Sequence, residues 1–489
     1  MKINLQNSVI EIENKSLNKS SLTILFSLDG KLIRNKEFKH LKPTQFNDLD
    51  NLASISHLND NGTSYLIVSL GESSKLNLNN YLKALGALSA YLKAHKKIDS
   101  INLTVDNHTA KALGMDFKQY VEKTIFHMIN FMYYFDERKT KRLTLTLKKI
   151  NVVSDNGIDS TIASAIALLE GIFLLKHLAN NPANYTTPTY LANSAKEIAK
   201  SSKKVKADIL NEAQIKKLKM GAFLSIAKGS TEEPKFITLQ YQGGKAKDQP
   251  IVIIGKGITF DSGGISLKPR ENMHHMKFDM CGAATVLGTF LSCVKLELPI
   301  NLNLIVPTCE NMPSGRAIKP GDIVTSMSGK TIEVVNTDAE GRMILCDALT
   351  YAKRYNPKLV IDMATLTGAS TTLMGKAACV LYSNDDKYSK ALIKSGEITS
   401  DKAWQMPLFE EYLEMLTTNT DADLVNIGSW SGAAGTSTAA MFLSQFVDYP
   451  WVHLDIANVA MGKSRFDSSE YNGASGRPFF MLMDFLRKQ

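Results

Sequence analysis

The feature that most constrains the fold is a set of short, nearly continuous apolar runs in the second half of the chain. Ile251-Val-Ile-Ile254 and Leu359-Val-Ile-Asp362 carry apolar side chains in succession rather than in alternation. A strand of this kind must be covered on both faces, as in a sheet with helices on each side. Helical patterns from about Ala283 to Lys295 and from Met343 to Arg354 fall between such strands. The pattern predicts an α/β/α domain.

The first third of the chain alternates in the same way, with shorter elements. Four strand-like runs are expected at Leu22–Phe26, Tyr65–Ser69, Ile101–Val105 and Leu143–Leu147, with helices at Leu78–Lys96 and Phe117–Phe135. Because 489 residues exceed one ordinary core, two domains are expected. A helical pattern then runs to the turn-forming Asn180-Asn-Pro-Ala-Asn184. We therefore predict a small N-terminal α/β accessory domain at 1–160, a linker helix at 161–180 and a larger domain at 181–489.

Composition favours a soluble cytoplasmic protein. Hydrophobic residues make up 44% of the chain and charged residues 21%, with no run of eighteen uncharged apolar residues and no amino-terminal signal peptide, so no membrane association is expected. The five cysteines form no CxxC pair, which favours reduced, packed thiols.

The net charge of +9 could reflect nucleic-acid affinity. However, the lysines are scattered in pairs without interleaved aromatic residues, so nucleic-acid binding is kept only as an alternative.

Two clusters of carboxylates follow apolar strands and carry the strongest chemical signal. Asp261 lies in Gly255-Lys-Gly-Ile-Thr-Phe-Asp-Ser-Gly-Gly264, and Asp279 comes just before a predicted helix. Asp338 and Glu340 lie in Asn336-Thr-Asp-Ala-Glu-Gly-Arg342. Four like charges in a partly desolvated site cost several kcal/mol unless cations neutralise them. Bridging carboxylates suit two divalent ions held roughly 3.5–4 Å apart, as in two-metal hydrolases.

Two cations beside these clusters have chemistry of their own. Arg342 stays charged next to a metal and can hold a planar anion with its forked guanidinium. Lys268 offers a mobile point charge that can stabilise an oxyanion. The sequence thus indicates metal-assisted hydrolysis.

Blander interpretations of the same residues remain open from the sequence. Asp338 could cap a helix, with Glu340 in the first turn and Arg342 solvated. The Gly-Lys-Gly segment could bind phosphate, although no GxxxxGK[ST] pattern is present. His274 and His275 could bind zinc, but the chain has no HExxH motif. An exposed loop pair is the simpler interpretation. Ser262 lacks a GxSxG elbow, and Cys281 and Cys346 are expected to pack in the core.

The motifs taken together resemble those of a known family. They are the segments 256–268, 276–284, 336–342 and 364–369, supported by Glu310–Pro313, Pro320–Asp322, Trp404–Leu408 and Val452–Ala457. In this order they closely resemble the leucyl aminopeptidase family, the cytosolic dizinc or dimanganese exopeptidases. The resemblance covers the chain from about Asn181 to its end. It implies two domains, with a larger C-terminal α/β/α catalytic domain built on a mixed central sheet.

The resemblance also implies roles for individual residues. Lys256, Asp261, Asp279 and Glu340 would hold the tighter ion, Zn²⁺ or Mn²⁺, and Asp261, Asp338 and Glu340 the exchangeable one. Lys268 would stabilise the tetrahedral intermediate, and Arg342 would hold a bicarbonate ion that acts as general base. The free amino group of the peptide would bind the exchangeable ion, which confines cleavage to the first residue.

Substrate contacts and assembly follow from the same resemblance. The substrate-binding residues would be Met276, Asn336, Thr365, Leu366, Gly368, Ala457 and Ala460. Some relatives carry methionine at the position of Ala460, so a roomier pocket for the first residue is expected. A homohexamer built from two trimers is implied. Two further classes are kept open: a nucleic-acid-binding protein on the same fold, and another metallohydrolase such as a phosphatase.

Overall fold

The computed structural model describes residues 1–5, 7–33, 38, 40–41, 51–154, 156–428, 433–462 and 473–489. The chain divides into two compact units, with the boundary between Phe173 and Leu174. Helix α4 (Asp159–Asn180) runs through this boundary. Both units combine helices with mixed sheets, which confirms the predicted α/β class. The role of the first unit as an accessory domain stays a prediction.

The first unit is built on one mixed sheet with the strand order β1-β2-β8-β7-β3-β6-β5, and β4 pairs with β3. The strands are β1 (Lys2–Leu5), β2 (Ser8–Asn14), β3 (Leu22–Leu28), β4 (Lys31–Leu32), β5 (Ile55–Asp60), β6 (Thr63–Ser69), β7 (Ser100–Thr104) and β8 (Lys149–Val153). Its helices are α1 (Leu78–Ala94), α2 (Asn107–Ala112) and α3 (Phe117–Asn130). Each of these helices begins where an Asn or Asp side chain accepts a backbone N–H of the first turn, at Asn77, Asp106 and Asp116.

The strand expected at Leu143–Leu147 is wrong, because this segment belongs to no strand or sheet. Leu145 and Leu147 are buried while their neighbours are more exposed, and that alternation imitates a strand. The backbone of Leu145 instead bonds the side chain of Ser8: its N–H donates to Ser8 Oγ at 3.0 Å, and its carbonyl accepts from the same oxygen at 3.3 Å. The strand that enters the sheet is the next one, β8.

The second unit contains the larger sheet, of order β18-β17-β20-β16-β11-β13-β10-β9, with β12 paired to β13. Its strands are β9 (Val205–Leu210), β10 (Lys235–Gln242), β11 (Ile251–Gly255), β12 (Gly257–Asp261), β13 (Asn301–Asn311), β16 (Leu359–Ala364), β17 (Cys379–Ser383), β18 (Ala403–Gln405) and β20 (Trp451–Asp455). The neighbours β20, β16, β11 and β13 are parallel, whereas β10 runs antiparallel to β13 and β9, and β17 antiparallel to β20. The central sheet is therefore mixed, as expected.

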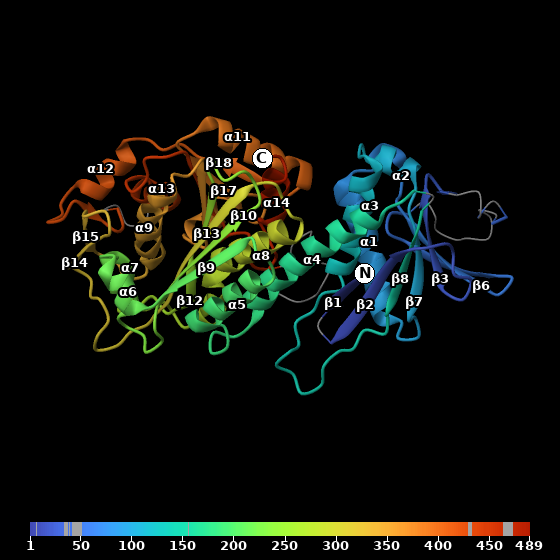
Figure 1. The fold of residues 1–489 in the computed structure, drawn as a ribbon, viewed down its shortest axis with the longest axis horizontal. Helices are drawn as coiled ribbons and strands as arrows, with labels where there is room; N and C mark the ends of the chain where they lie inside the picture. Colours follow the sequence, from blue (N-terminus) through green and yellow to red (C-terminus); the bar gives the residue numbers. More distant parts are fainter. Residues whose placement is uncertain are drawn as a thin grey trace. The chain divides into compact units, whose positions relative to one another are not determined.

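Helices cover both faces of this sheet (Figure 1). On one face, α5 (Pro188–Lys200) and α8 (Cys281–Lys295) pack on the strands; on the other, α7 (Gly221–Ala227) and α9 (Glu340–Ala352) do so. Every residue of β11 and β16 is buried, which explains why these strands read as continuous apolar runs. The remaining helices are α6 (Glu212–Lys217), α10 (Ala369–Met374), α11 (Asp386–Thr399), α12 (Glu411–Thr417), α13 (Gly435–Ser444) and α14 (Phe479–Leu486).

A separate three-stranded sheet stands beside α7 and was not predicted from the sequence. It has the order β14 (Asp322–Thr325), β15 (Thr331–Val334), β19 (Leu424–Val425). Its central strand β15 leads directly into the segment 336–342. This small sheet therefore fixes where that carboxylate cluster begins.

Within the residues that the structure describes, two helical stretches are long and apolar enough to cross a membrane, Asp159–Asn180 and Met273–Lys295. Their most apolar windows are 67% and 89% buried inside the protein, as in the core helices of globular domains. All five cysteines are free and buried, in agreement with the expectation of packed thiols.

Candidate active site

The site lies where the parallel strands β11, β16 and β20 end at one edge of the larger sheet. Gly255 is paired in register with Met363, and Ala364 with Asp455, so the three strands stop at nearly the same level. Lys256, Thr365 and Ile456 follow immediately. Open α/β sheets place ligands at this edge.

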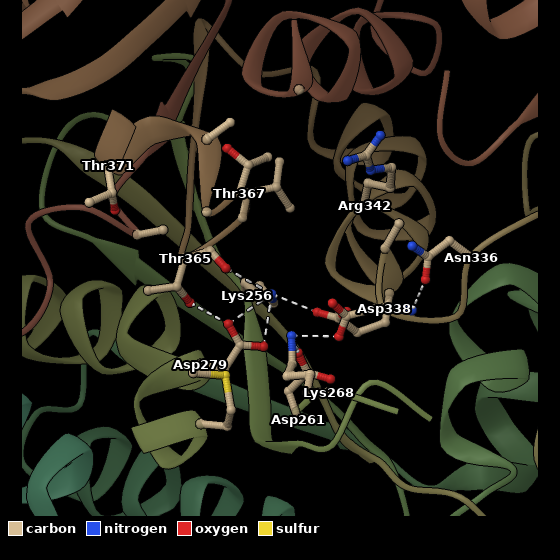
Figure 2. Close-up of a pocket in the computed structure, with 18 of the residues that line it drawn as sticks. Lys256, Asp261, Lys268, Asp279, Asn336, Asp338, Arg342, Thr365, Thr367 and Thr371 are labelled. Atoms are coloured by element: carbon tan, nitrogen blue, oxygen red, sulfur yellow. Dashed lines mark hydrogen bonds and ion pairs between the residues drawn. The ribbon is translucent and has the colours of Figure 1, made fainter. Parts of the chain in front are cut away.

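A cavity of about 440 Å³ opens there. All the residues nominated from the sequence line it, namely Lys256, Asp261, Lys268, Met276, Asp279, Asn336, Asp338, Glu340, Arg342, Thr365, Leu366, Gly368, Ala457 and Ala460. Figure 2 shows Lys256, Lys268, Asp279, Asp338 and Thr365 converging from separate segments of the chain, with Arg342 and Asn336 to one side. The fold thus brings residues from distant parts of the sequence into one cavity, and their individual roles stay predictions.

Three of the acids form a tight group. Asp261, Asp338 and Glu340 each offer a carboxylate oxygen, and these oxygens lie within 4.8 Å of one another. Lys268 bridges two of the acids, with its Nζ 2.8 Å from Asp261 Oδ2 and 2.5 Å from Asp338 Oδ1 (Figure 2). Such a group of hard oxygen donors is suited to a divalent cation.

The fourth acid, Asp279, joins the group through Lys256. The Lys256 Nζ lies 2.8 Å from Asp279 Oδ2 and 2.7 Å from Glu340 Oε1, and it donates to the carbonyl of Thr365 at 2.9 Å. The Thr365 hydroxyl also donates to Asp279 Oδ1 at 2.8 Å. Lys256 is 2% exposed, which is unusual for a lysine and demands close counter-charges.

Glycines allow the backbone to come this close. Gly263, two residues after Asp261, has φ 88°, in the left-handed region where a side chain is strained, and its N–H donates to Asp261 Oδ1 at 2.9 Å. Gly341 lies in the first turn of α9, where an added Cβ would come within 2.7 Å of Lys256 Nζ. The glycines between the charged residues are therefore needed for the packing of the site.

The electrostatics of the site are unbalanced, with four carboxylates facing two ammonium groups. Burial, together with the charge of Glu340, raises the pKa of Asp261 to about 6, although Lys268 opposes the shift. Burial likewise raises the pKa of Asp279 well above its usual range. Burial disfavours the charge of Lys256, yet the surrounding carboxylates outweigh it and raise its pKa. The carboxylates crowd one another and still lack positive charge, which bound cations would supply.

Arg342 is buried, and the described part of the chain places no counter-ion at hydrogen-bonding distance from it. The side chain is 5% exposed, and neither its Nε nor its Nη1 has a hydrogen-bond partner among the described residues. Burial lowers the pKa of the guanidinium to about 10, although Glu340 and Asp455 act in the opposite direction. Two buried donors without a hydrogen-bond partner leave hydrogen-bonding capacity for an anionic ligand.

The structure contradicts the simple helix-start interpretation of this segment. Helix α9 has Ala339 as its N-cap, without a side-chain hydrogen bond, so Asp338 does not cap it. Arg342 is buried rather than solvated. Only the placement of Glu340 in the first turn was right.

The structure also decides how Lys256, the two histidines and Ser262 are used. The ammonium of Lys256 is engaged by carboxylates, which does not fit a phosphate loop. His274 and His275 lie in the 3-10 helix η4 (Met273–Met280) rather than in a loop, and the partly buried His275 lines the cavity. Ser262 Oγ donates to the carbonyl of Asn311 at 2.7 Å, a structural contact.

Several residues at the site were not predicted from the sequence. Asn311 donates through Nδ2 to Asp261 Oδ1 at 2.8 Å and to the carbonyl of Thr337 at 3.0 Å, which ties the two carboxylate loops together. Ile427, Thr438 and Met461 line the cavity but carry no local motif. Asn311 could have been noticed, because it lies in the segment Glu310–Pro313 that shares the family's pattern.

Comparison with known proteins agrees with this geometry. A sequence model described as "Cytosol aminopeptidase family, catalytic domain" matches residues 173–483. The chain is 42% identical over 489 residues to a "Probable cytosol aminopeptidase" of Saccharophagus degradans, covering 95% of this chain and 96% of that protein. It is 51% identical over 373 residues to a protein of the same description from Burkholderia pseudomallei, with 75% and 72% covered.

A solved structure extends the likeness to the whole fold. The chain is similar to the "Bottromycin maturation enzyme BotP", with a TM-score of 0.83 and 27% identity, over 96% of this chain and 99% of that one. The family match includes every residue of the carboxylate cluster.

Proposed function

We propose that this chain, which belongs to the cytosol aminopeptidase family, uses two divalent cations to release leucine-like and other apolar residues from the amino ends of peptides. Membership makes it a hydrolase, a metallo-exopeptidase that removes amino-terminal residues. The observation that carries the finer proposal is the convergence of four carboxylates and a buried lysine in one cavity.

The residues present fit a pair of cations. Asp279 Oδ2 and Asp338 Oδ1 are buried oxygens whose close partners are the ammonium groups of Lys256 and Lys268, the positions that cations would take over. Lys256, Asp261, Asp279 and Glu340 would hold the tighter ion, and Asp261, Asp338 and Glu340 the exchangeable one. Zn²⁺ and Mn²⁺ are the proposed metals. When bound, they would supply Lewis acidity for the peptide carbonyl and lower the pKa of a water molecule to about 7.

Lys256 would bind as a neutral amine. Its raised pKa arises from the carboxylates around it. Cations that neutralise these carboxylates remove the reason for the extra proton, and a buried ammonium then loses its proton readily.

The two other positively charged side chains of the site, Lys268 and Arg342, would act on charge that develops during the reaction. Lys268 reaches over Asp261 and Asp338 with a side chain that is 21% exposed, so it can turn toward the oxyanion of a tetrahedral intermediate. Arg342, with its unpaired Nε and Nη1, would hold a bicarbonate ion. The fork of a guanidinium matches a planar, carboxylate-like anion, so Arg342 would orient this ion as the proposed general base for the attacking water.

Selection for the first residue would come from the apolar side of the cavity. Met276, Ala457 and Ala460 line it with small or flexible apolar groups, and the loop of Thr365, Leu366 and Gly368 also contributes to the wall. Asn336 lies at the start of the Asp338 loop, and its side chain accepts the Asp338 N–H at 2.8 Å. The short alanine at 460 would make this part of the pocket roomier than methionine at the same position would.

A comparison of free and blocked peptides tests this proposal. The purified protein, loaded with Mn²⁺ or Zn²⁺, should release leucine from a short peptide with a free amino end and lose this activity with a chelator. The matched peptide with an acetylated amino end should not be cleaved, because the amino group would anchor the substrate. Equal hydrolysis of both peptides would refute the exopeptidase mechanism.

We also propose a cytoplasmic location and a homohexameric assembly of two trimers, by likeness to the family. Light scattering after size-exclusion chromatography gives the mass in solution. A particle near six times the chain mass of 54.0 kDa supports this assembly, and a stable monomer refutes it.

A further inference from the structure

The carboxylate of Asp455, at the end of β20, joins two loops of the site. Its Oδ1 accepts the backbone N–H groups of Leu366 at 3.2 Å, of Thr367 at 3.4 Å and of Ala457 at 3.2 Å. Its Oδ2 accepts the Thr367 hydroxyl at 2.6 Å. The side chain is 1% exposed. One buried group therefore holds the loop after β16 against the loop after β20.

The first of these loops bears directly on the proposed ligands. Thr365 precedes the bonded residues, and its carbonyl accepts from Lys256 while its hydroxyl donates to Asp279 (Figure 2). Leu366 and Ala457, whose N–H groups Asp455 binds, both line the cavity. A shift of this loop would therefore move the partners of Lys256 and Asp279 together with one wall of the substrate pocket.

The strand that carries Asp455 is tied to its neighbour by buried side chains. His453 and Trp451 share its strand two and four positions earlier, and both bond Asp362 of the neighbouring β16: His453 Nδ1 lies 2.6 Å from Asp362 Oδ1, and Trp451 Nε1 donates to Asp362 Oδ2 at 2.6 Å. These side chains lie on one face of the sheet, because residues two apart in a strand point the same way. All of them are buried. Asp455 thus follows, on the same face of β20, two buried side chains that Asp362 holds by hydrogen bonds.

We infer that Asp455 is a positioning residue, which sets the loop 365–368 so that Thr365 aligns Lys256 and Asp279 for the metal and Leu366 shapes the pocket for the first substrate residue. The inference rests on the proposed function. It goes further by assigning metal affinity and side-chain selectivity to a residue that touches neither metal nor substrate. Outer partners of metal ligands typically contribute about 10–100-fold to metal affinity or activity.

Three substitutions remove different numbers of these hydrogen bonds and should weaken metal binding to different degrees. Asp455→Ala removes all four hydrogen bonds and should weaken Mn²⁺ binding by about 10–100-fold, as measured by calorimetry, with a similar fall in kcat/KM. It should also change the ratio of kcat/KM for leucine over alanine p-nitroanilide. Asp455→Asn keeps the Oδ1 acceptor, and Thr367→Val removes only the hydroxyl contact, so each should show a smaller loss in the same direction.

Asp347 provides the matched control. It is also fully buried and accepts backbone N–H groups, from Phe223 at 2.9 Å and Met327 at 2.7 Å, but it does not line the cavity. Asp347→Ala should lower the melting temperature yet leave Mn²⁺ affinity and the leucine-to-alanine ratio as in the wild type.

The outcomes separate this inference from the proposed function. If the Asp455 variants melt earlier but keep wild-type Mn²⁺ affinity and selectivity, Asp455 is only structural and the inference is overturned. If Asp455→Ala does not fold, wild-type values in both Asp455→Asn and Thr367→Val overturn it equally. If the wild-type protein releases no amino acid, the proposed function fails, whereas the Mn²⁺ affinities still decide the role of Asp455.

Discussion

Gly341→Ala offers a sharp test of the site, because the added methyl group would meet the proposed lysine ligand. The new Cβ would lie 2.7 Å from both Cε and Nζ of Lys256 and 2.9 Å from Leu366 Cδ1. Ordinary contact begins near 3.4 Å, so the end of the lysine must retreat by about 0.7 Å. The atoms that move belong to the far end of a flexible side chain, and the fold therefore has room to adjust.

The expected effect falls on function rather than on stability. A misplacement of about 1 Å in a catalytic constellation can cost about 100-fold in rate, so a loss of about 10–100-fold in kcat is expected for Gly341→Ala. Alanine favours a helix over glycine by up to about 1 kcal/mol, which offsets part of the crowding and keeps the melting temperature within a few degrees of the wild type.

The assay is leucine release at saturating Mn²⁺, with a calorimetric measurement of Mn²⁺ binding in parallel. Gly315→Ala is the control, because no described atom lies within 4 Å of its added Cβ, and this variant should behave as the wild type. Full activity and full metal affinity in Gly341→Ala would refute the placement of Lys256 as a ligand.

Further predictions separate metal binding from other contributions. Glu340→Ala and Asp338→Ala should lose activity together with metal, whereas Lys268→Ala and Arg342→Ala should lose turnover with metal retained; equal metal loss in all four, by elemental analysis, would contradict this division. Chelation should lower the melting temperature, because the carboxylates then lose their counter-charge. Mn²⁺ at a hundred times its dissociation constant should restore about 2.7 kcal/mol of stability. A melting temperature that changes neither with the chelator nor with Mn²⁺ would refute metal binding at this site. Burial raises the pKa of Asp347 to about 7, above its value in the unfolded chain, so the stability that its proton contributes is complete at low pH and is lost as the pH rises through 7. Denaturation of wild type and Asp347→Asn should therefore diverge between about pH 4 and 7, and parallel pH profiles would exclude this titration.

The elements that sequence alone placed well are those whose pattern has one physical cause. Continuous apolar runs such as Ile251–Ile254 are typical of strands covered on both faces, and β11 is buried at every position. The strand prediction at Leu143–Leu147 was wrong because alternate residues can also be buried outside a sheet, and here the backbone of Leu145 bonds the side chain of Ser8. The three-stranded sheet was missed because short strands such as Leu424–Val425 carry too little pattern.

At the site, sequence motifs identified the charged residues but not how they are held. The spacing around Asp338 could not distinguish a helix cap from a metal ligand. In the structure, Ala339 rather than Asp338 is the N-cap of α9. Arg342 is buried, and its Nε and Nη1 have no hydrogen-bond partner among the described residues. Asn311 bonds Asp261, which is 50 positions away in the sequence, and Asp455 bonds Leu366, which is 89 positions away. Such long-range hydrogen bonds leave no local signal, because they depend on which strands become neighbours.

Anomalous diffraction from crystals soaked in Mn²⁺ tests most directly whether these acids share a pair of cations. Two peaks are expected, roughly 3.5–4 Å apart, among the carboxylates of Asp261, Asp279, Asp338 and Glu340, with the Lys256 amine beside one of them. A cavity without a peak at saturating Mn²⁺, with Lys256 and Lys268 still paired to these acids, would contradict the two-metal mechanism.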